Sequence, residues 1–499
     1  MKNMKIMAVL LTFLIGGLSG MARSEEDNAP KSKVLLPDLI GQREELSIFA
    51  KLLQETGWAD SLLRSVDESY VPVSEVPPKV SSVTFPVQGF APPQKPIAYT
   101  VFAECDSVFA AYGISDAATL TAYLQEHYGG EYMYGDLLYD DQYTDERHVA
   151  NRFVSYHLLP QKLWPEQLVY HYNENDFDLD DYLATGIAKP TVPIYDYYAT
   201  MGTPQRLLKV YESKESQGVR LNRIVTFKQD VYEEDVVKKE GLLISKAQMD
   251  SALNGNVYFL NDLLVYDEWM SYAGLGQERL RFDLSSISPE LMNLGYRRIM
   301  NSSARAVYLV PDFLSNIKSL AGNLYYLPGF RSNWSDYQGD ELLLVSENDN
   351  LDVLIMLPPV PADGTYQLRL GLSGNPYRSV VQYYVGGESA IWPMGLPVDE
   401  RTQNNNEDYK KYGLGNPSFV DENLLIFHGG HMKAPGIFSK RINSSIGRRI
   451  IGEVAMNADQ KYYLRIKSMI KSEMQLFLDY IELVPSAVYN NPSQPEDPW

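Results

Sequence analysis

Two short segments carry side chains of the kind that bind metal ions. His428 and His431 place two imidazoles within four residues, and structural zinc sites need four such ligands. The acidic run at residues 176–181 alternates carboxylates as calcium ligands do, and residues 346–350 are similar. The histidines have no further ligand at zinc spacing, and the acidic run lacks the glycine and the later glutamate of an EF-hand. We therefore predict no metal site, with calcium at the acidic runs as the open alternative.

Motifs of common enzymes are missing from the sequence. There is no Gly-x-Ser-x-Gly elbow, no phosphate-cradling glycine loop and no His-Glu-x-x-His helix. The single cysteine, Cys105, lies between Glu104 and Asp106, which raise the pKa of its thiol, so we expect a small, partly apolar core residue. We predict no catalytic residue and no cofactor. A glycoside hydrolase stays an alternative, because the 64 Asp and Glu residues can supply carboxylate pairs from distant strands.

The composition is that of an acidic protein rich in tyrosine. The formal net charge is −20, and the chain has 36 Tyr against six His. Nucleic-acid binding depends on clustered Lys and Arg, so we exclude nucleic acid as a partner. Tyrosine joins a large apolar ring to a polar tip, which suits β-rich folds and half-wet contact surfaces. A chain of 499 residues is too long for one hydrophobic core, so we expect several domains.

The beginning of the chain predicts export. Residues 1–24 have the pattern of a signal peptide, in which two lysines precede an apolar run at residues 6–18 and small residues follow. That run is too short to span a bilayer, and no later segment is suitable, so we predict no transmembrane helix. Leu18-Ser19-Gly20-Met21 resembles the lipobox of bacterial lipoproteins, with Met21 in place of the lipidated cysteine. We expect a location at the cell surface or in the periplasm.

Helix and strand signals alternate in the first half of the chain. Apolar residues at helical spacing run through residues 46–53, and Gly57 supplies a helix stop. Residues 97–103 are a predicted strand that leads into Asp106, the expected N-cap of a short helix, and Ser115 is expected to cap the next one. These elements place a strand directly before two short helices.

Three segments of this half form an ordered set of motifs. Residues 99–109 are an apolar strand that continues through Phe-Ala and an aspartate to Val-Phe. Residues 151–160 contain a Tyr-His pair and end in proline, and residues 253–264 combine an Asn-Gly turn with a final apolar strand. In this order the segments resemble the signatures of a fasciclin (FAS1) domain, with Glu104 and Cys105 where the family has proline and threonine.

The resemblance covers about residues 35–267 and implies a compact α+β fold, a β-sandwich flanked by helices. The family acts in adhesion and extracellular binding, and no catalysis is implied. Tyr156 and His157 fall on the family's Tyr-His motif, which is associated with adhesive contacts, so they are candidate binding residues. The alternative is that the imidazole is hydrogen-bonded inside the fold and the tyrosine ring packs on the core. Acidic, tyrosine-rich insertions at residues 129–145 and 164–191 are expected on the surface.

Strand signals dominate the second half of the chain. Residues 268–330 are predicted to form a connecting subdomain, with a helix start at Ser288-Pro289-Glu290. From residue 331, apolar stretches alternate with Gly, Pro and Asn turns, which is the pattern of an antiparallel sandwich. The clearest strand candidates are residues 341–345, 353–357, 366–370, 379–385, 450–454, 462–467 and 476–484.

The pattern over residues 331–488 resembles a galactose-binding-like jelly roll, an all-β fold common among carbohydrate-binding modules. The resemblance is carried by residues 365–370, 381–387 and 478–485. Sugar binding uses an exposed aromatic ring beside hydrogen-bonding groups, and Trp334, Tyr337 and Trp392 are candidates because they lie in predicted loops. The alternative for each is a packing residue or an isolated surface aromatic. Residues 489–499 are predicted to be a disordered tail.

The expected fold class is multidomain, an α+β fasciclin-like domain followed by an all-β jelly-roll sandwich. On an exported chain this combination resembles surface proteins of the Bacteroidetes type, where similar architectures accompany glycan uptake. The leading hypothesis is a non-catalytic adhesion or scaffold protein that binds a surface protein or a polysaccharide. The alternatives are a glycan-binding accessory protein of a polysaccharide-uptake system and, third, the hydrolase.

Overall fold

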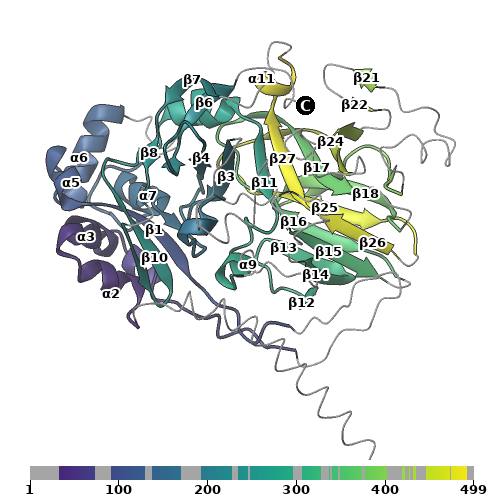
Figure 1. Cartoon of the computed structure of the whole chain (residues 1–499), viewed down its shortest axis with the longest axis horizontal. Helices are drawn as coiled ribbons and strands as arrows, with labels where there is room; N and C mark the ends of the chain where they lie inside the picture. The colour runs from purple at the N-terminus through teal and green to yellow at the C-terminus, as the bar shows by residue number, and fades with distance from the viewer. Residues whose placement is uncertain are drawn as a thin grey trace, which may run out of the picture.

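In the computed structural model, helices and small sheets build one side of the molecule and longer strands build the other (Figure 1). The predicted signal peptide with Met21, much of the two predicted insertions and residues 492–499 lie outside the described residues. The structure describes residues 33–73, 91–129, 137–169, 193–227, 234–245, 248–295, 306–327, 337, 340–346, 349–373, 377–401, 419–421, 426–427, 431–433, 446–471 and 474–491.

One sheet of the N-terminal half brings the three motif segments together. β1 (Tyr99–Glu104) is buried along its whole length and pairs in parallel with β10 (Gly255–Leu260). β2 (Leu158–Leu159) pairs with the other edge of β1, and β9 (Met249–Ala252) pairs with β10, which gives the order β2-β1-β10-β9. Parallel neighbours need a long crossover, and the chain between β1 and β10 carries half of the described helices of this half and both of its small sheets.

Short helices lie at the outer side of this half, at the left of Figure 1. α3 (Ser47–Glu55) buries Phe49, Leu52 and Leu53, so the predicted apolar face is confirmed. Gly57 follows with φ of +80°, a left-handed conformation that glycine adopts without strain. In the described ranges no helix is long and apolar enough to cross a membrane. Further helices are α2 (Leu36–Gly41), η1 (Glu44–Leu46), α4 (Trp58–Ser61), α5 (Asp106–Ala111), α6 (Ala117–Tyr128), α7 (Val149–Tyr156) and η3 (Pro165–Gln167).

The starts of two helices differ from the prediction by one residue. Asp116, and not Ser115, caps α6, because its carboxylate accepts the backbone amide three residues further on, at 2.9 Å. Cys105, and not Asp106, stands at the N-cap of α5. The Asp106 carboxylate instead accepts the backbone amide of Ile48 at 2.9 Å, which ties α5 to α3.

Two small sheets occupy the middle of the chain. In the first, β3-β4-β5-β8, all neighbours are antiparallel, and in the second β6 pairs with β7. Their strands are β3 (Ile194–Ala199), β4 (Leu207–Glu212), β5 (Arg220–Leu221), β6 (Ile224–Phe227), β7 (Glu234–Lys239) and β8 (Leu242–Leu243).

The C-terminal half is a β-sandwich whose strands all pair antiparallel. Its strands are β11 (Leu280–Asp283), β12 (Val307–Leu309), β13 (Ile317–Ala321), β14 (Asn323–Leu327), β15 (Glu341–Ser346), β16 (Asp352–Met356), β17 (Gly364–Ser373), β18 (Val380–Gly387), β19 (Ile391–Pro393), β20 (Val398–Asp399), β21 (Phe419–Asp421), β22 (Ile426–Phe427), β23 (His431–Lys433), β24 (Ile446–Met456), β25 (Tyr462–Ser468), β26 (Met474–Leu478) and β27 (Tyr480–Pro485). They form three sheets, ordered β11-β27-β17-β24-β23-β22-β21, β13-β16-β25-β18-β19 and β12-β14-β15-β26, and β20 also pairs with β18. Many buried apolar residues of these sheets belong to one large hydrophobic cluster, and β14, β15 and β26 also contribute to a second, smaller one.

The observed strands refine two predictions for this half. The predicted strand at residues 476–484 is two strands, β26 and β27, which belong to different sheets. The break is at Asp479, which is buried and whose carboxylate accepts the Tyr337 amide at 3.0 Å. The segment predicted as a connecting subdomain supplies β11 to β14 to the sandwich sheets. The helix predicted to start at Ser288 is observed as α9 (Pro289–Asn293), whereas η4 (Met270–Gly274), η5 (Leu275–Gln277) and α11 (Ser486–Tyr489) were not predicted.

A buried charge cluster joins four strands of the sandwich. The Glu482 carboxylate on β27 contacts Arg281 of β11 at 2.7 Å, Arg369 of β17 at 3.4 Å and Arg448 of β24 at 3.2 Å. All four side chains are at most 1% exposed. Removing one member of such a group leaves an uncompensated charge inside the protein, so the cluster fixes the register of these strands.

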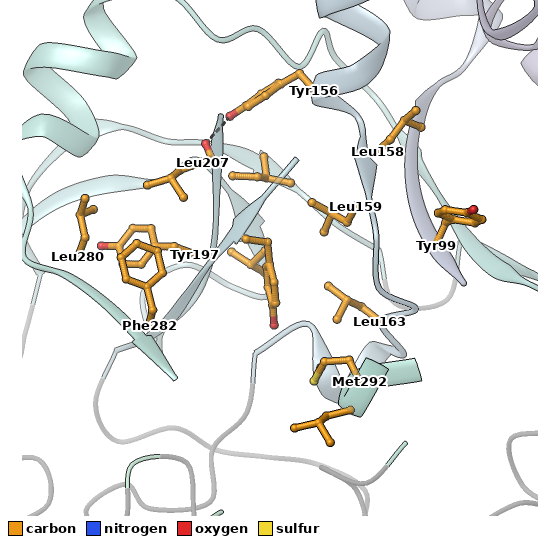
Figure 2. Close-up of a cluster of buried hydrophobic side chains, with 14 of the residues drawn as sticks. Tyr99, Tyr156, Leu158, Leu159, Leu163, Tyr197, Leu207, Leu280, Phe282 and Met292 are labelled. Atoms are coloured by element: carbon orange, nitrogen blue, oxygen red, sulfur yellow. Dashed lines mark hydrogen bonds between the residues drawn. The ribbon is translucent and has the colours of Figure 1, made fainter. Parts of the chain in front are cut away.

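The two halves pack against each other through a continuous apolar cluster (Figure 2). Tyr197 of β3 packs on Phe282 of β11, with 5.6 Å between ring centroids, and donates its hydroxyl to Glu278 at 2.7 Å. Arg206 reaches across to Asp459 at 2.7 Å, and Tyr266 donates to a carbonyl oxygen of the C-terminal half. Hydrogen bonds and an ion pair therefore accompany the apolar contact between the halves.

Lys162 is a buried ammonium at the edge of this contact. Its Nζ donates to the Ala252 carbonyl at 3.0 Å and lies over the Trp164 ring, and none of the described residues gives it a carboxylate partner. Burial lowers the pKa of Lys162 to about 8 from an ordinary 10.5. Between these two values the unfolded chain binds more protons than the folded chain, so the free energy of unfolding rises with pH.

We therefore expect the Lys162→Met variant to lose part of this pH dependence. Between pH 7 and pH 9.5 the free energy of unfolding of the wild type should rise by about 2 kcal/mol relative to the variant. Urea denaturation of both proteins at the two pH values measures the difference. Identical pH dependence in the two proteins would show that Lys162 is not held in a desolvated site.

Candidate functional site

A cavity of about 490 Å³ opens on the N-terminal half, and its size is typical of ligand sites. Its walls come from three places: the region of α5 and α6, the strands from β5 to β8, and the segment of residues 261–267 that follows β10. We call it the tyrosine pocket, because Tyr112, Tyr123 and Tyr128 line it together with Lys239, Asp262 and Asp267.

The tyrosines of the pocket form an aromatic surface. The rings of Tyr112 and Tyr123 meet edge to face with 5.5 Å between centroids, and Tyr112 is 38% exposed. Tyr123 also stacks on His127, one helical turn further along α6, at 4.2 Å. This contact fixes one face of the Tyr123 ring and helps to hold the aromatic surface in place.

A carboxylate stands directly beside this surface. Asp262 Oδ1 accepts the Tyr112 hydroxyl at 2.7 Å and the Leu263 amide at 2.8 Å. The bond to Asp262 raises the pKa of Tyr112 to about 12, so Tyr112 stays a neutral hydrogen-bond donor. Oδ2 receives no hydrogen bond from the described part of the chain, and it can accept one from a ligand hydroxyl.

Lys239 contributes a restrained ammonium to the opposite wall. Its Nζ lies 5.8 Å from the centre of the Trp269 ring and 3.8 Å from the sulfur of Met270. Burial lowers the pKa of Lys239, and the charge of Asp267 opposes that shift. The lysine is therefore positioned by apolar and aromatic groups, and it is the only one of the pocket residues named above that carries a positive charge at neutral pH.

A buried acid and base hold the segment of residues 261–267 in place. Glu104 at the end of β1 and His157 after α7 are both fully buried, and Oε1 of the carboxylate lies 2.7 Å from Nε2 of the imidazole. The same oxygen accepts the backbone amide of Leu264 at 3.0 Å. His157 Nδ1 lies 2.7 Å from the Phe153 carbonyl oxygen, which only accepts, so Nδ1 carries a proton. Residues of all three predicted motifs meet at this point.

Tyr156 holds a second wall of the pocket. Its hydroxyl accepts a hydrogen bond from Asn222 Nδ2 at 2.9 Å and donates one to the Leu207 carbonyl oxygen at 3.1 Å (Figure 2). Asn222 lines the pocket and has φ of +56°, a left-handed conformation that asparagine tolerates better than most residues. Its side-chain oxygen also accepts the Lys209 amide at 3.2 Å. Tyr156 thus lies one hydrogen bond away from a pocket residue, and His157 is linked to the segment of residues 261–267 through Glu104.

The sequence-predicted binding residues have very different environments. Tyr156 is 1% exposed and His157 is not exposed, so their side chains do not reach an external partner in this structure. Their environment matches the packing alternative. The prediction of Tyr337 as an exposed glycan-binding ring is wrong: the residue is 5% exposed, because its ring packs on Tyr480 and beside Arg281. Trp392 on β19 is 68% exposed, as a binding aromatic must be.

Other candidates of the sequence analysis lie partly outside the described residues. Trp334, His428 and the acidic run at residues 176–181 cannot be placed, and residues 346–350 are only partly described. Where side chains are described, no group of three or more His, Cys, Asp or Glu residues can hold a metal ion. Cys105 is a half-buried free thiol, and burial together with Glu45, Asp106 and Glu104 raises its pKa, in the direction that the sequence predicts.

Sequence reasoning did not find the tyrosine pocket. It predicted the helix that follows Ser115, but nothing in the sequence showed that the Tyr123 ring on this helix is only half-buried and lines a cavity. The available signal was the spacing of Tyr112, Tyr123 and Tyr128 around two short helices. That spacing indicates a pocket only once the segment of residues 261–267, which is distant in the sequence, is known to lie beside these helices.

Comparisons with known proteins give no family. No protein-family model and no curated protein sequence matches the chain. The chain is similar over 60% of its length to 22% of a Paenibacillus xanthan lyase, at 8% identity and a TM-score of 0.22. It is also similar over 59% of its length to 97% of a carbohydrate-binding module of the β-sandwich superfamily, at 7% identity and a TM-score of 0.17. A third similarity covers 58% of this chain and 68% of an exo-β-1,3-galactanase from Phanerochaete chrysosporium, at 12% identity and a TM-score of 0.17.

Alignments of this kind do not establish a common fold. The chain spans less than a quarter of the length of the xanthan lyase. The TM-scores of these three structures are too low to show that the elements are arranged alike. The function therefore has to be argued from the pocket and its supports.

The Glu104–His157 pair makes a prediction for stability. Replacing His157 by Leu leaves a buried carboxylate without its partner and should lower the free energy of unfolding by roughly 3–5 kcal/mol. In the Glu104→Gln/His157→Leu double variant the loss should be smaller than the sum of the two single losses, since the buried charge is gone. Urea denaturation of the four proteins gives the coupling energy. Additive losses would mean that the two groups do not act as a pair.

Proposed function

We propose that this chain is a non-catalytic, exported binding protein whose ligand is a glycan held in the tyrosine pocket. The observation that carries the proposal is the juxtaposition of the Tyr112 and Tyr123 rings with the Asp262 carboxylate in one cavity. Sugar C–H faces stack on aromatic rings, while sugar hydroxyls need fixed donors and acceptors beside them. The two tyrosines and the aspartate supply both, from two walls of the cavity that the Tyr112–Asp262 hydrogen bond joins.

The arrangement of the carboxylates favours binding over cleavage. Glycoside hydrolases place two carboxylates on opposite sides of the scissile bond, whereas Asp262 and Asp267 come from one short segment after β10. Asp267 Oδ1 accepts the Met270 amide at 2.8 Å, so it has a structural task at the start of η4. Asp262 is engaged by Tyr112. These engagements support a binding site.

We further propose that the N-terminal half is fasciclin-like and that the protein acts in surface adhesion or glycan capture. The proposal is supported by the meeting of the three motif segments in the sheet β2-β1-β10-β9 and around Glu104. In this view the Tyr-His motif acts through the pocket walls that it supports, and the sandwich is a second unit docked on the first.

The first test uses affinity electrophoresis of the full chain in gels that contain neutral polysaccharides. The Tyr112→Ala variant and the Tyr123→Ala variant should each weaken binding by roughly tenfold, because each removes a stacking ring. Trp392→Ala is the matched control, an exposed aromatic of the sandwich. A loss confined to Trp392→Ala would move the site to the sandwich, and no retardation by any polysaccharide would favour protein-directed adhesion.

The second test asks whether Tyr156 positions the pocket. The Tyr156→Phe variant keeps the buried ring but loses the hydroxyl that holds Asn222, so glycan binding should weaken about threefold to tenfold. Tyr198→Phe is the control: it removes a hydroxyl that is equally buried and donates to Gln167 at 3.3 Å. Both variants should lose about 1 kcal/mol of stability, measured by urea denaturation. Equal effects on binding would contradict a positioning role.

A further inference from the structure

The tyrosine pocket has an excess of negative charge. Four charged side chains line it: three carboxylates, of Asp262, Asp267 and Glu240, and one ammonium, of Lys239. Glu240 is paired outside the pocket with Arg223, which also holds Glu234 at 2.5 Å. Within the described parts of the chain, neither Asp262 nor Asp267 has a basic group within ion-pair distance. The pocket thus presents two carboxylates that no cation compensates directly.

The single lysine of the pocket is poorly placed to reverse this balance. Its ammonium faces the Trp269 ring and the Met270 sulfur, which stabilise it in the wall. A ligand carboxylate would have to draw Lys239 away from these contacts and approach Asp267, whose charge acts on the same lysine. Lys239 therefore offsets part of the negative charge but offers no open anion site.

Asp262 is the carboxylate that a ligand meets first. It stands beside the exposed Tyr112 ring, and only one of its oxygens accepts hydrogen bonds from the described residues. A sugar hydroxyl stacked over Tyr112 can donate to the other oxygen, whereas a sugar carboxylate at the same place would meet like charge in a partly desolvated cavity.

Resting on the proposed function, we infer that the tyrosine pocket selects neutral glycans and rejects those that carry carboxylates, and that Asp262 is the residue that sets this selectivity. The discriminating quantity is the ratio of two affinities, one for a neutral polysaccharide and one for the same polysaccharide bearing carboxylates. In such a comparison backbone, linkage and ring shape are the same, so the two forms differ only where a primary hydroxyl has become a charged carboxylate.

The experiment first tests the full chain by affinity electrophoresis against β-1,3-glucan, β-1,4-galactan and galactomannan, and against polygalacturonate and alginate. The neutral polysaccharide that binds best is then oxidised at a fraction of its primary hydroxyls to carboxylates. Calorimetry compares the two forms. For the wild type the oxidised form should bind roughly tenfold more weakly at low salt, and the ratio should shrink in concentrated salt.

Two charge variants make the test specific to Asp262. Asp262→Asn should bring the ratio of affinities markedly closer to one, whatever its effect on binding of the neutral form, while Asp267 and Glu240 remain in place. Asp312→Asn removes the same charge from an exposed position of the C-terminal half, where the Asp312 side chain forms a surface pair with Lys318, and should leave the ratio unchanged. The ratio is a readout that a general loss of stability would not move.

The outcomes separate this inference from the proposed function. Wild-type binding to an acidic polysaccharide that is lost in Tyr123→Ala would overturn the charge selectivity while keeping the pocket as the site. An unchanged ratio in Asp262→Asn would remove Asp262 from the role. No binding to any of the five polysaccharides would overturn the proposed function and this inference with it.

Discussion

The buried contact between Glu104 and His157 is the constraint on which the N-terminal half depends. A carboxylate and an imidazole without solvent access must remain together, because either alone would be an unpaired polar group in an apolar core. The contact joins the end of β1, the end of α7 and the backbone of Leu264, three points far apart in the sequence. It therefore acts as a fixed point from which the neighbouring segments take their positions.

The tyrosine pocket shows how such a fixed point leads to a binding surface. The segment after β10 runs along the surface, yet its backbone is bonded to the buried acid, so Asp262 and Asp267 are carried on a rigid base. On the other wall, Asn222 is held by the buried hydroxyl of Tyr156. Residues of the pocket walls and residues of the core are thus separate, and single hydrogen bonds link them. This separation allows the exposed residues to vary without loss of the fold.

The sequence predicted local elements better than their assembly. The helix that buries Phe49 and the strand at 99–104 follow from apolar spacing, which depends only on near neighbours. The division of residues 476–484 into two strands does not, since it depends on the Asp479 carboxylate accepting the amide of Tyr337, a residue distant in the sequence. The burial of Tyr337 depends on the same distant contact, so the sequence analysis expected this residue in a loop. The pocket was missed because its walls come from segments that no local pattern connects.

The pairing of β11 with β27 gives the chain an order of assembly. β27 is the last strand of the described residues, and it lies between β11 and β17, which are made long before it during synthesis from the N-terminus. Until residues 480–485 arrive, β11 and β17 lack their shared neighbour, and Arg281, Arg369 and Arg448 lack the Glu482 carboxylate. A chain cut short before this strand keeps an open sheet edge. Closure of this sheet therefore waits for residues 480–485, so chains cut short before them are distinguishable to proteases.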